Sequence, residues 1–217
     1  MKILLLNGSG RKEYGNSECI LRKLREFLEI KGETDIEECR ITKNPDDYID
    51  ICNKMQVASV IVLSNPIYYS SLPAFILLFL QKIRQNWQEN GVAHKVYFIC
   101  NCGYYEPDEG ENCIDQLKQW TKQMNFEWGQ GLSVGASEMM GKLRNIPVNV
   151  GPNQIMGEKL NILSDSIINF ATGENLYSIP AGISKKEFFV QVNKRWDYMI
   201  KTGIYHKKMF DENGNEI

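Results

Sequence analysis

Short, continuous apolar segments recur along this chain, with stretches of helical spacing between them. The clearest are residues 2–6 (KILLL), 58–63 (ASVIVL) and 96–100 (VYFIC), which have no polar face and therefore fit strands buried on both sides. A mixed segment at 35–41 and a weaker one at 126–134 complete the set. The intervening helices are expected at residues 17–31, 46–55, 72–88 and 112–124. Such alternation predicts a three-layer α/β fold, in which helices cover both faces of a five-stranded parallel sheet.

The pattern changes near Gly151, where the alternation stops and two helices follow at about 153–172 and 185–202. A chain of 217 residues can bury a substantial core. We expect a main domain followed by a C-terminal helical extension packed on the same domain, and then a polar, flexible tail. The boundaries of these three parts are predicted at 1–150, 151–205 and 206–217.

The charge of the chain is nearly balanced, with 25 basic and 27 acidic residues. Nucleic acids and anionic membrane surfaces call for a basic excess, so neither is an expected partner. The first apolar segment is too short for a signal peptide, and no stretch approaches the roughly 20 apolar residues of a membrane span. The six cysteines show no regular pairing framework, which predicts a cytoplasmic protein with reduced thiols.

The turn after the first apolar segment contains three glycines within residues 7–16 and leads into a helix. Backbone N–H groups and the positive end of a helix meet at such a turn and favour an anion, most often a phosphate. The P-loop pattern G-x-x-x-x-G-K-[ST] fails because Asn16 replaces the lysine, and the dinucleotide pattern G-x-G-x-x-G fails because Glu13 replaces the third glycine. The turn therefore fits a single terminal phosphate, bound by the donors of Ser9, Arg11, Asn16 and Ser17.

Two aromatic loops follow the strands predicted at 58–63 and 96–100. Residues 64–73 contain two prolines and the adjacent Tyr68 and Tyr69, and residues 101–105 contain a glycine that lets the backbone approach a ring. Ligands of a doubly wound sheet bind at the carboxyl ends of its strands, where all three loops should meet. Together they indicate a planar heterocycle with a phosphate tail.

These segments resemble the flavodoxin-like NAD(P)H-dependent FMN reductase family over about residues 1–140. The matching motifs are Gly8-Ser-Gly-Arg11 with Gly15-Asn-Ser17, Pro66-Ile-Tyr-Tyr-Ser-Ser-Leu-Pro73, Asn101-Cys-Gly-Tyr-Tyr105 and Trp128-Gly-Gln-Gly131. The resemblance implies a flavodoxin-like three-layer sandwich with strand order 2-1-3-4-5 and extra C-terminal helices. It also implies FMN as the cofactor and NADPH or NADH as the reductant.

By the same resemblance, thirteen residues would contact FMN. The phosphate would bind to the first loop, at Ser9, Arg11, Gly15, Asn16 and Ser17. The isoalloxazine ring would lie against the two aromatic loops, at Pro66, Ile67, Tyr68, Tyr69, Asn101, Cys102, Gly103 and Tyr104. Arg11 could instead meet a nucleotide phosphate of the reductant.

No acid–base constellation is evident, and the two histidines, His94 and His206, fall outside the candidate loops. A flavin enzyme needs none, because flavin N5 carries the chemistry and the protein supplies position and electrostatics. We therefore expect no catalytic side chain, no metal site, and ping-pong transfer of hydride to a small acceptor such as a quinone, a nitro- or azo-aromatic, free flavin or a metal ion. The alternatives are a flavodoxin-type electron carrier or redox-sensing flavoprotein without turnover, and a flavin-free interaction module.

The helix that begins near residue 74 carries the segment AFILLFL at 74–80, which is apolar all round. Such a helix must be covered on more than one side, either by the C-terminal helices or by a second subunit. Because dimers are common in the family that the chain resembles, a homodimer is expected.

Overall fold

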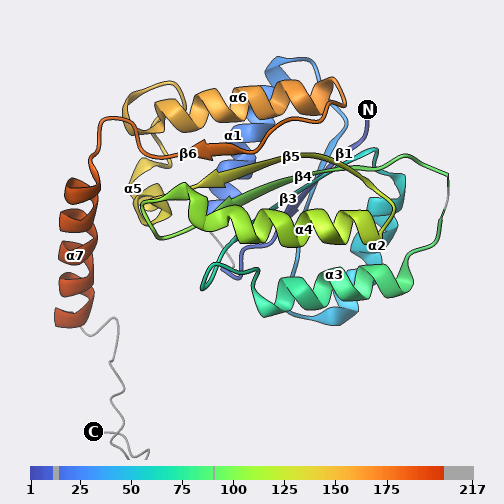
Figure 1. Ribbon diagram of the computed structural model, residues 1–217, viewed down its shortest axis with the longest axis horizontal. Coiled ribbons are helices and arrows are strands. Elements are labelled where there is room, and N and C mark those ends of the chain that lie inside the picture. Colours follow the sequence, from blue (N-terminus) through green and yellow to red (C-terminus); the bar gives the residue numbers. More distant parts are fainter. Residues whose placement is uncertain (12–14, 90, 203–217) are drawn as a thin grey trace, which may run out of the picture. The chain divides into compact units, whose positions relative to one another are not determined.

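The computed structural model describes residues 1–11, 15–89 and 91–202, so the tail predicted at 206–217 lies outside the described residues. Six strands form one sheet in the order β2-β1-β3-β4-β5-β6, and every neighbouring pair is parallel (Figure 1). The strands are β1 (Ile3–Asn7), β2 (Ile36–Arg40), β3 (Val60–Pro66), β4 (Lys95–Asn101), β5 (Glu127–Val134) and β6 (Leu176–Ser178). The predicted α/β class and the strand order 2-1-3-4-5 are confirmed.

The sixth strand corrects the prediction of five strands. In the segment between the helices predicted at 153–172 and 185–202, Leu176, Tyr177 and Ser178 pair with Leu132, Ser133 and Val134 of β5. The strand is only three residues long and lies at the edge of the sheet, so its sequence carries no usable alternation. The α/β alternation therefore continues beyond residue 151, with α6 as the crossover between β5 and β6.

Helices cover both faces of the sheet (Figure 1). The bounds of the α-helices are α1 (Asn16–Ile30), α2 (Tyr48–Val57), α3 (Ala74–Asn86), α4 (Glu111–Gln123), α5 (Met140–Leu143), α6 (Gln154–Ile168) and α7 (Lys185–Lys201). Short 3₁₀ helices lie at Pro45–Asp47, Pro107–Gly110, Ser137–Met139 and Gly151–Asn153.

Successive residues of the central strands point to opposite faces and build two separate cores. On β1, Leu4 and Leu6 pack into the cluster formed with α2, α3 and α4. Ile3 and Leu5 pack into the cluster formed with α1 and α6. Because both faces are covered, the central strands are apolar throughout, which is the pattern that made them recognisable.

The contacts divide the chain into two compact units, residues 1–182 and 183–217. The first unit contains all six strands, and α7 belongs to the second, where Ser184 and Glu187 form a reciprocal capping box at its start. The predicted boundaries at 150 and 205, and the packing of the last helix on the main domain, stay predictions. In the part of the chain that the structure describes, no helix combines the length and the apolar character needed to cross a membrane.

Candidate functional site

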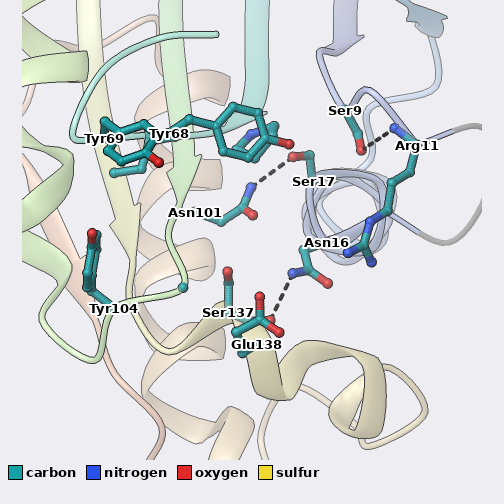
Figure 2. A pocket seen from close by; sticks show the side chains of 13 residues that line it. Ser9, Arg11, Asn16, Ser17, Tyr68, Tyr69, Asn101, Tyr104, Ser137 and Glu138 are labelled. Atoms are coloured by element: carbon teal, nitrogen blue, oxygen red, sulfur yellow. Dashed lines mark hydrogen bonds between the residues drawn. The ribbon is translucent and has the colours of Figure 1, made fainter. Parts of the chain in front are cut away.

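A pocket of about 370 Å³ lies at the carboxyl ends of β1, β3, β4 and β5 (Figure 2). All strands of the sheet are parallel, so the loops that follow them meet at this one edge. The pocket is lined by Ser9, Arg11, Asn16, Ser17, Pro66, Ile67, Tyr68, Tyr69, Asn101, Gly103, Tyr104, Ser137 and Glu138.

The loop after β1 is held by its own side chains. The Ser9 N–H donates to Asn7 Oδ1 at 3.0 Å, and the Arg11 N–H donates to Ser9 Oγ at 3.3 Å. Helix α1 then begins at Asn16, directly after Gly15, and its first N–H groups have no partner within the helix. A Cβ atom on Gly15 would overlap the Ser9 side chain, so the loop needs a glycine at this position.

A buried side-chain amide at the end of β4 bonds to helix α1. Asn101, the last residue of β4, is only 2% exposed. Its Nδ2 donates to Ser17 Oγ at 2.8 Å (Figure 2). The same Nδ2 also donates to the Asn65 carbonyl at 3.2 Å. The polar end of the pocket therefore has fixed hydroxyl and amide groups rather than freely rotating ones.

The loop after β3 contains a strained two-residue turn. Tyr68 and Ser71 exchange backbone hydrogen bonds of 3.0 and 3.1 Å, and the residues between them, Tyr69 and Ser70, have φ angles of 51° and 54°. Left-handed backbone at both central positions is typical of turns occupied by Asn-Gly, and a non-glycine residue there costs about 1–2 kcal/mol. The turn leaves the Tyr69 side chain 97% exposed at the pocket.

Side chains from the start of α4 and the turn before it hold this tyrosine loop. Glu109 accepts from Ser70 Oγ at 2.7 Å, and Asn112 Nδ2 donates to the Ser70 carbonyl at 2.8 Å. Gln116 bonds both the Ser71 hydroxyl and the Leu72 N–H. The strained backbone is thus stabilised from outside the pocket.

Sequence reasoning missed the fourth wall of the pocket, Ser137 and Glu138 after β5. The Ser137 carbonyl accepts from Asn16 Nδ2 at 2.8 Å (Figure 2). The Ser137 N–H donates to the Cys102 carbonyl at 2.8 Å. The signal was available, because three small residues, Gly135, Ala136 and Ser137, directly follow the strand predicted at 126–134.

Eleven of the thirteen residues predicted to contact a ligand line the pocket, and Gly15 and Cys102 do not. Gly15 packs against the Ser9 side chain. Cys102 is 1% exposed, its N–H and carbonyl are bonded to Val134 and Ser137, and its thiol lies near the carbonyls of Tyr104 and Glu106. Burial raises the pKa of this thiol to about 11, so it stays protonated and serves as a packing group.

The two ends of the pocket differ in chemistry. One end combines the Arg11 guanidinium with the hydroxyls of Ser9 and Ser17 and the start of α1, a donor set that suits a phosphate. The other end presents the rings of Tyr68, Tyr69 and Tyr104, which suit a flat heterocycle. The volume lies within the range of small-ligand sites, and the residues present therefore fit a flavin mononucleotide.

Residues 1–127, more than half of the chain, match the family model described as NADPH-dependent FMN reductase. The family that the motifs indicated is thereby confirmed. No curated protein matches the sequence.

Solved structures share the fold at low sequence identity. The apo form of NADH:FMN oxidoreductase (EmoB) has a TM-score of 0.58 at 14% identity, and the match covers 80% of this chain and 91% of that one. A structure described as flavone reductase has a TM-score of 0.57 at 13% identity, covering 87% of this chain and 69% of that one. A flavodoxin from Streptococcus pneumoniae TIGR4 has a TM-score of 0.53 at 13% identity, covering 78% and 99%. These similarities confirm the flavodoxin-like fold class.

Proposed function

This chain belongs to the NADPH-dependent FMN reductase family, and we propose that it is an FMN-dependent oxidoreductase that uses NADPH or NADH. The observation that carries the proposal is a pocket at the carboxyl edge of the sheet that combines a phosphate-type donor set with three tyrosines. When bound, the flavin would supply the chemistry by accepting hydride at N5 and passing it to a small acceptor.

In this proposal the chain's own residues bind and orient the cofactor. Ser9, Asn16 and Ser17 would hold the phosphate, with Arg11 on the phosphate or on the reductant. The loops at 66–69 and 101–104 would hold the ring. Ser137 and Glu138 also line the pocket and would form its fourth wall.

The exposed rim supports a site shared by the two substrates. Tyr68, Tyr69 and Tyr104 are 56%, 97% and 51% exposed, so the aromatic end of the pocket is open to small molecules. A reductant and an acceptor would use this face in turn, which predicts ping-pong kinetics. The acceptor would be a quinone, a nitro- or azo-aromatic, free flavin or a metal ion.

We also propose a homodimer that works in the cytoplasm. Leu77 and Leu78 on α3 are 44% and 37% exposed, so the helix predicted to be covered on more than one side still presents leucines on its surface. A second subunit would cover them. All six cysteines are free thiols, and a reducing compartment would keep them so.

The deciding experiment is reduction of the purified, flavin-loaded protein under anaerobic conditions. Rapid bleaching of the flavin spectrum by NADPH or NADH, with parallel double-reciprocal lines in the presence of an acceptor, is the expected result. Slow or absent bleaching would favour the electron carrier or redox sensor. A protein that binds no FMN when FMN is added would overturn both.

A further inference from the structure

Arg40, the last residue of β2, contacts the phosphate loop without lining the pocket. Its Nη1 donates to the main-chain carbonyl of Arg11 and, at 3.5 Å, to that of Ser9. Its Nη2 donates to Glu18 Oε2 at 3.1 Å. One guanidinium therefore joins the loop, the first turn of α1 and the neighbouring strand.

The register of the sheet explains why Arg40 can do this. Arg40 pairs with Asn7, the residue at which β1 ends and the loop begins. Asn7 holds the Ser9 N–H, while Arg40 holds the carbonyls of Ser9 and Arg11. The loop is thus held at the Ser9 N–H by one strand and at two of its carbonyls by the next.

Both sets of bonds matter for an anion. A carbonyl oxygen that faced a phosphate would repel it, and Arg40 keeps two of them bonded outside the pocket. Glu18 places a carboxylate in the first turn of α1, where negative charge competes with a bound phosphate. The ion pair with Arg40 offsets that charge.

We propose that Arg40 is a positioning residue for the phosphate end of FMN, acting by fixing the carbonyls of Ser9 and Arg11. The inference rests on the proposed binding of FMN. It assigns to Arg40 a contribution to phosphate recognition without contact with the cofactor.

The test compares FMN with riboflavin, which has the same ring and ribityl chain but no phosphate. R40Q should raise the Kd for FMN about tenfold, the loss expected when charge-assisted hydrogen bonds are removed, and leave the Kd for riboflavin unchanged. R40K, which can bond one carbonyl but lacks the fork, should lie between R40Q and the wild type. Quenching of flavin fluorescence on addition of protein gives both constants. Where riboflavin binding does not reach saturation, the initial slopes of the two titrations are compared to give the ratio of the constants.

Three further variants separate the effect of the carbonyl bonds from the effect of charge. K54Q removes a cation on α2 whose Nζ lies 2.8 Å from Glu37, a residue of β2 away from the loop. This variant should change neither constant. E18Q retains the carbonyl bonds and should bind FMN at least as tightly as the wild type. R40Q/E18Q should recover only the part of the loss that the unpaired Glu18 carboxylate causes, and should still bind FMN more weakly than E18Q.

An unchanged ratio of FMN to riboflavin affinity in R40Q would overturn the inference, as would an FMN affinity of the double variant equal to that of E18Q. Equal weakening of both flavins would assign Arg40 to general stability and overturn it too. These results presuppose wild-type FMN binding, so failure of the proposed function is seen separately, as a wild-type protein that binds neither flavin.

Discussion

The two ends of the sheet are built from different kinds of interaction. At the amino end, the rings of Trp87, His94 and Phe126 contact one another edge to face or tilted, with centroids 4.8–5.0 Å apart. At the carboxyl end, the loops are joined by polar side chains, and the Tyr69–Ser70 turn has left-handed backbone. Contacts between aromatic rings dominate at the amino end, and hydrogen bonds between polar side chains and loops dominate at the carboxyl end.

This difference follows from the parallel sheet. All strands end at the carboxyl edge, and the helices that follow them, such as α1, begin there. The positive N-terminal ends of these helices concentrate hydrogen-bond donors at this edge. At the amino edge the strands begin, and a cavity of about 270 Å³ there is lined by the rings of Trp87, His94 and Phe126. We therefore expect substitutions at the amino end to change stability and substitutions at the carboxyl end to change flavin affinity.

The largest effect should come from F126A. It removes a ring that contacts Trp87, His94 and Trp120, and should lower the free energy of unfolding by about 3 kcal/mol. The Kd for FMN of the folded protein should not change. Y104A is the matched truncation at the pocket. It should raise the Kd for FMN and leave the free energy of unfolding nearly unchanged. Urea unfolding and FMN titration of both variants measure these effects. The comparison between the two ends fails if F126A weakens FMN binding as much as Y104A does.

Next in size is G15A, within the phosphate loop. The added Cβ would displace the Ser9 side chain, and we expect a Kd for FMN about 30-fold higher, or about 2 kcal/mol. G10A is the control in the same loop, because a Cβ on Gly10 meets only Lys43 and Phe75 atoms at 3.8 and 3.9 Å. FMN titration should separate the two variants, and equal affinities would remove the proposed role of Gly15.

A smaller effect, with the opposite sign, is expected at the strained turn. S70G should raise the free energy of unfolding by up to about 1 kcal/mol, because glycine adopts the φ of 54° without strain. The neighbouring S71G should destabilise the protein, since Ser71 has no positive φ and bonds Gln116. Denaturant unfolding measures both, and a loss of stability in S70G would show that its hydrogen bond to Glu109 outweighs the strain.

The placement of most pocket residues could be predicted because it depends on one rule. Ser9, Tyr68 and Asn101 each follow or end an apolar strand, and parallel topology brings such residues together. Ser137 and Glu138 obey the same rule, but glycines and polar residues interrupt the strand before them, which made it a weak candidate.

Other features could not be predicted because they depend on register or on tertiary contacts. The contact between Arg40 and the phosphate loop needs the pairing of Arg40 with Asn7, which no local pattern specifies. The Tyr69–Ser70 turn carries neither asparagine nor glycine, and side chains from α4 and the turn before it support it instead. β6 is too short to show alternation.

The smallest effect should be a pH dependence that belongs to the amino end alone. His94 is 5% exposed, its Nδ1–H donates to the Ala58 carbonyl at 2.8 Å, and its buried Nε2 has no partner in the described part of the chain. Burial lowers the pKa of the imidazole from its ordinary value of 6.5, although the bond to Ala58 opposes the shift. The native state therefore holds this ring neutral.

The sign of the effect follows from proton linkage. Below about pH 6.5 the unfolded chain binds a proton at this position that the native state does not, so stability present above pH 6.5 is lost as the pH falls towards the lowered pKa. Urea unfolding of the flavin-free protein between pH 7.5 and pH 5 should show this loss, and H94N should reduce it, with H206N as the control that removes the other histidine. FMN affinity should show no matching change, because the ring lies at the opposite end of the sheet. A wild-type slope in H94N would mean that other groups carry the acid sensitivity and that the ring cluster is not its source.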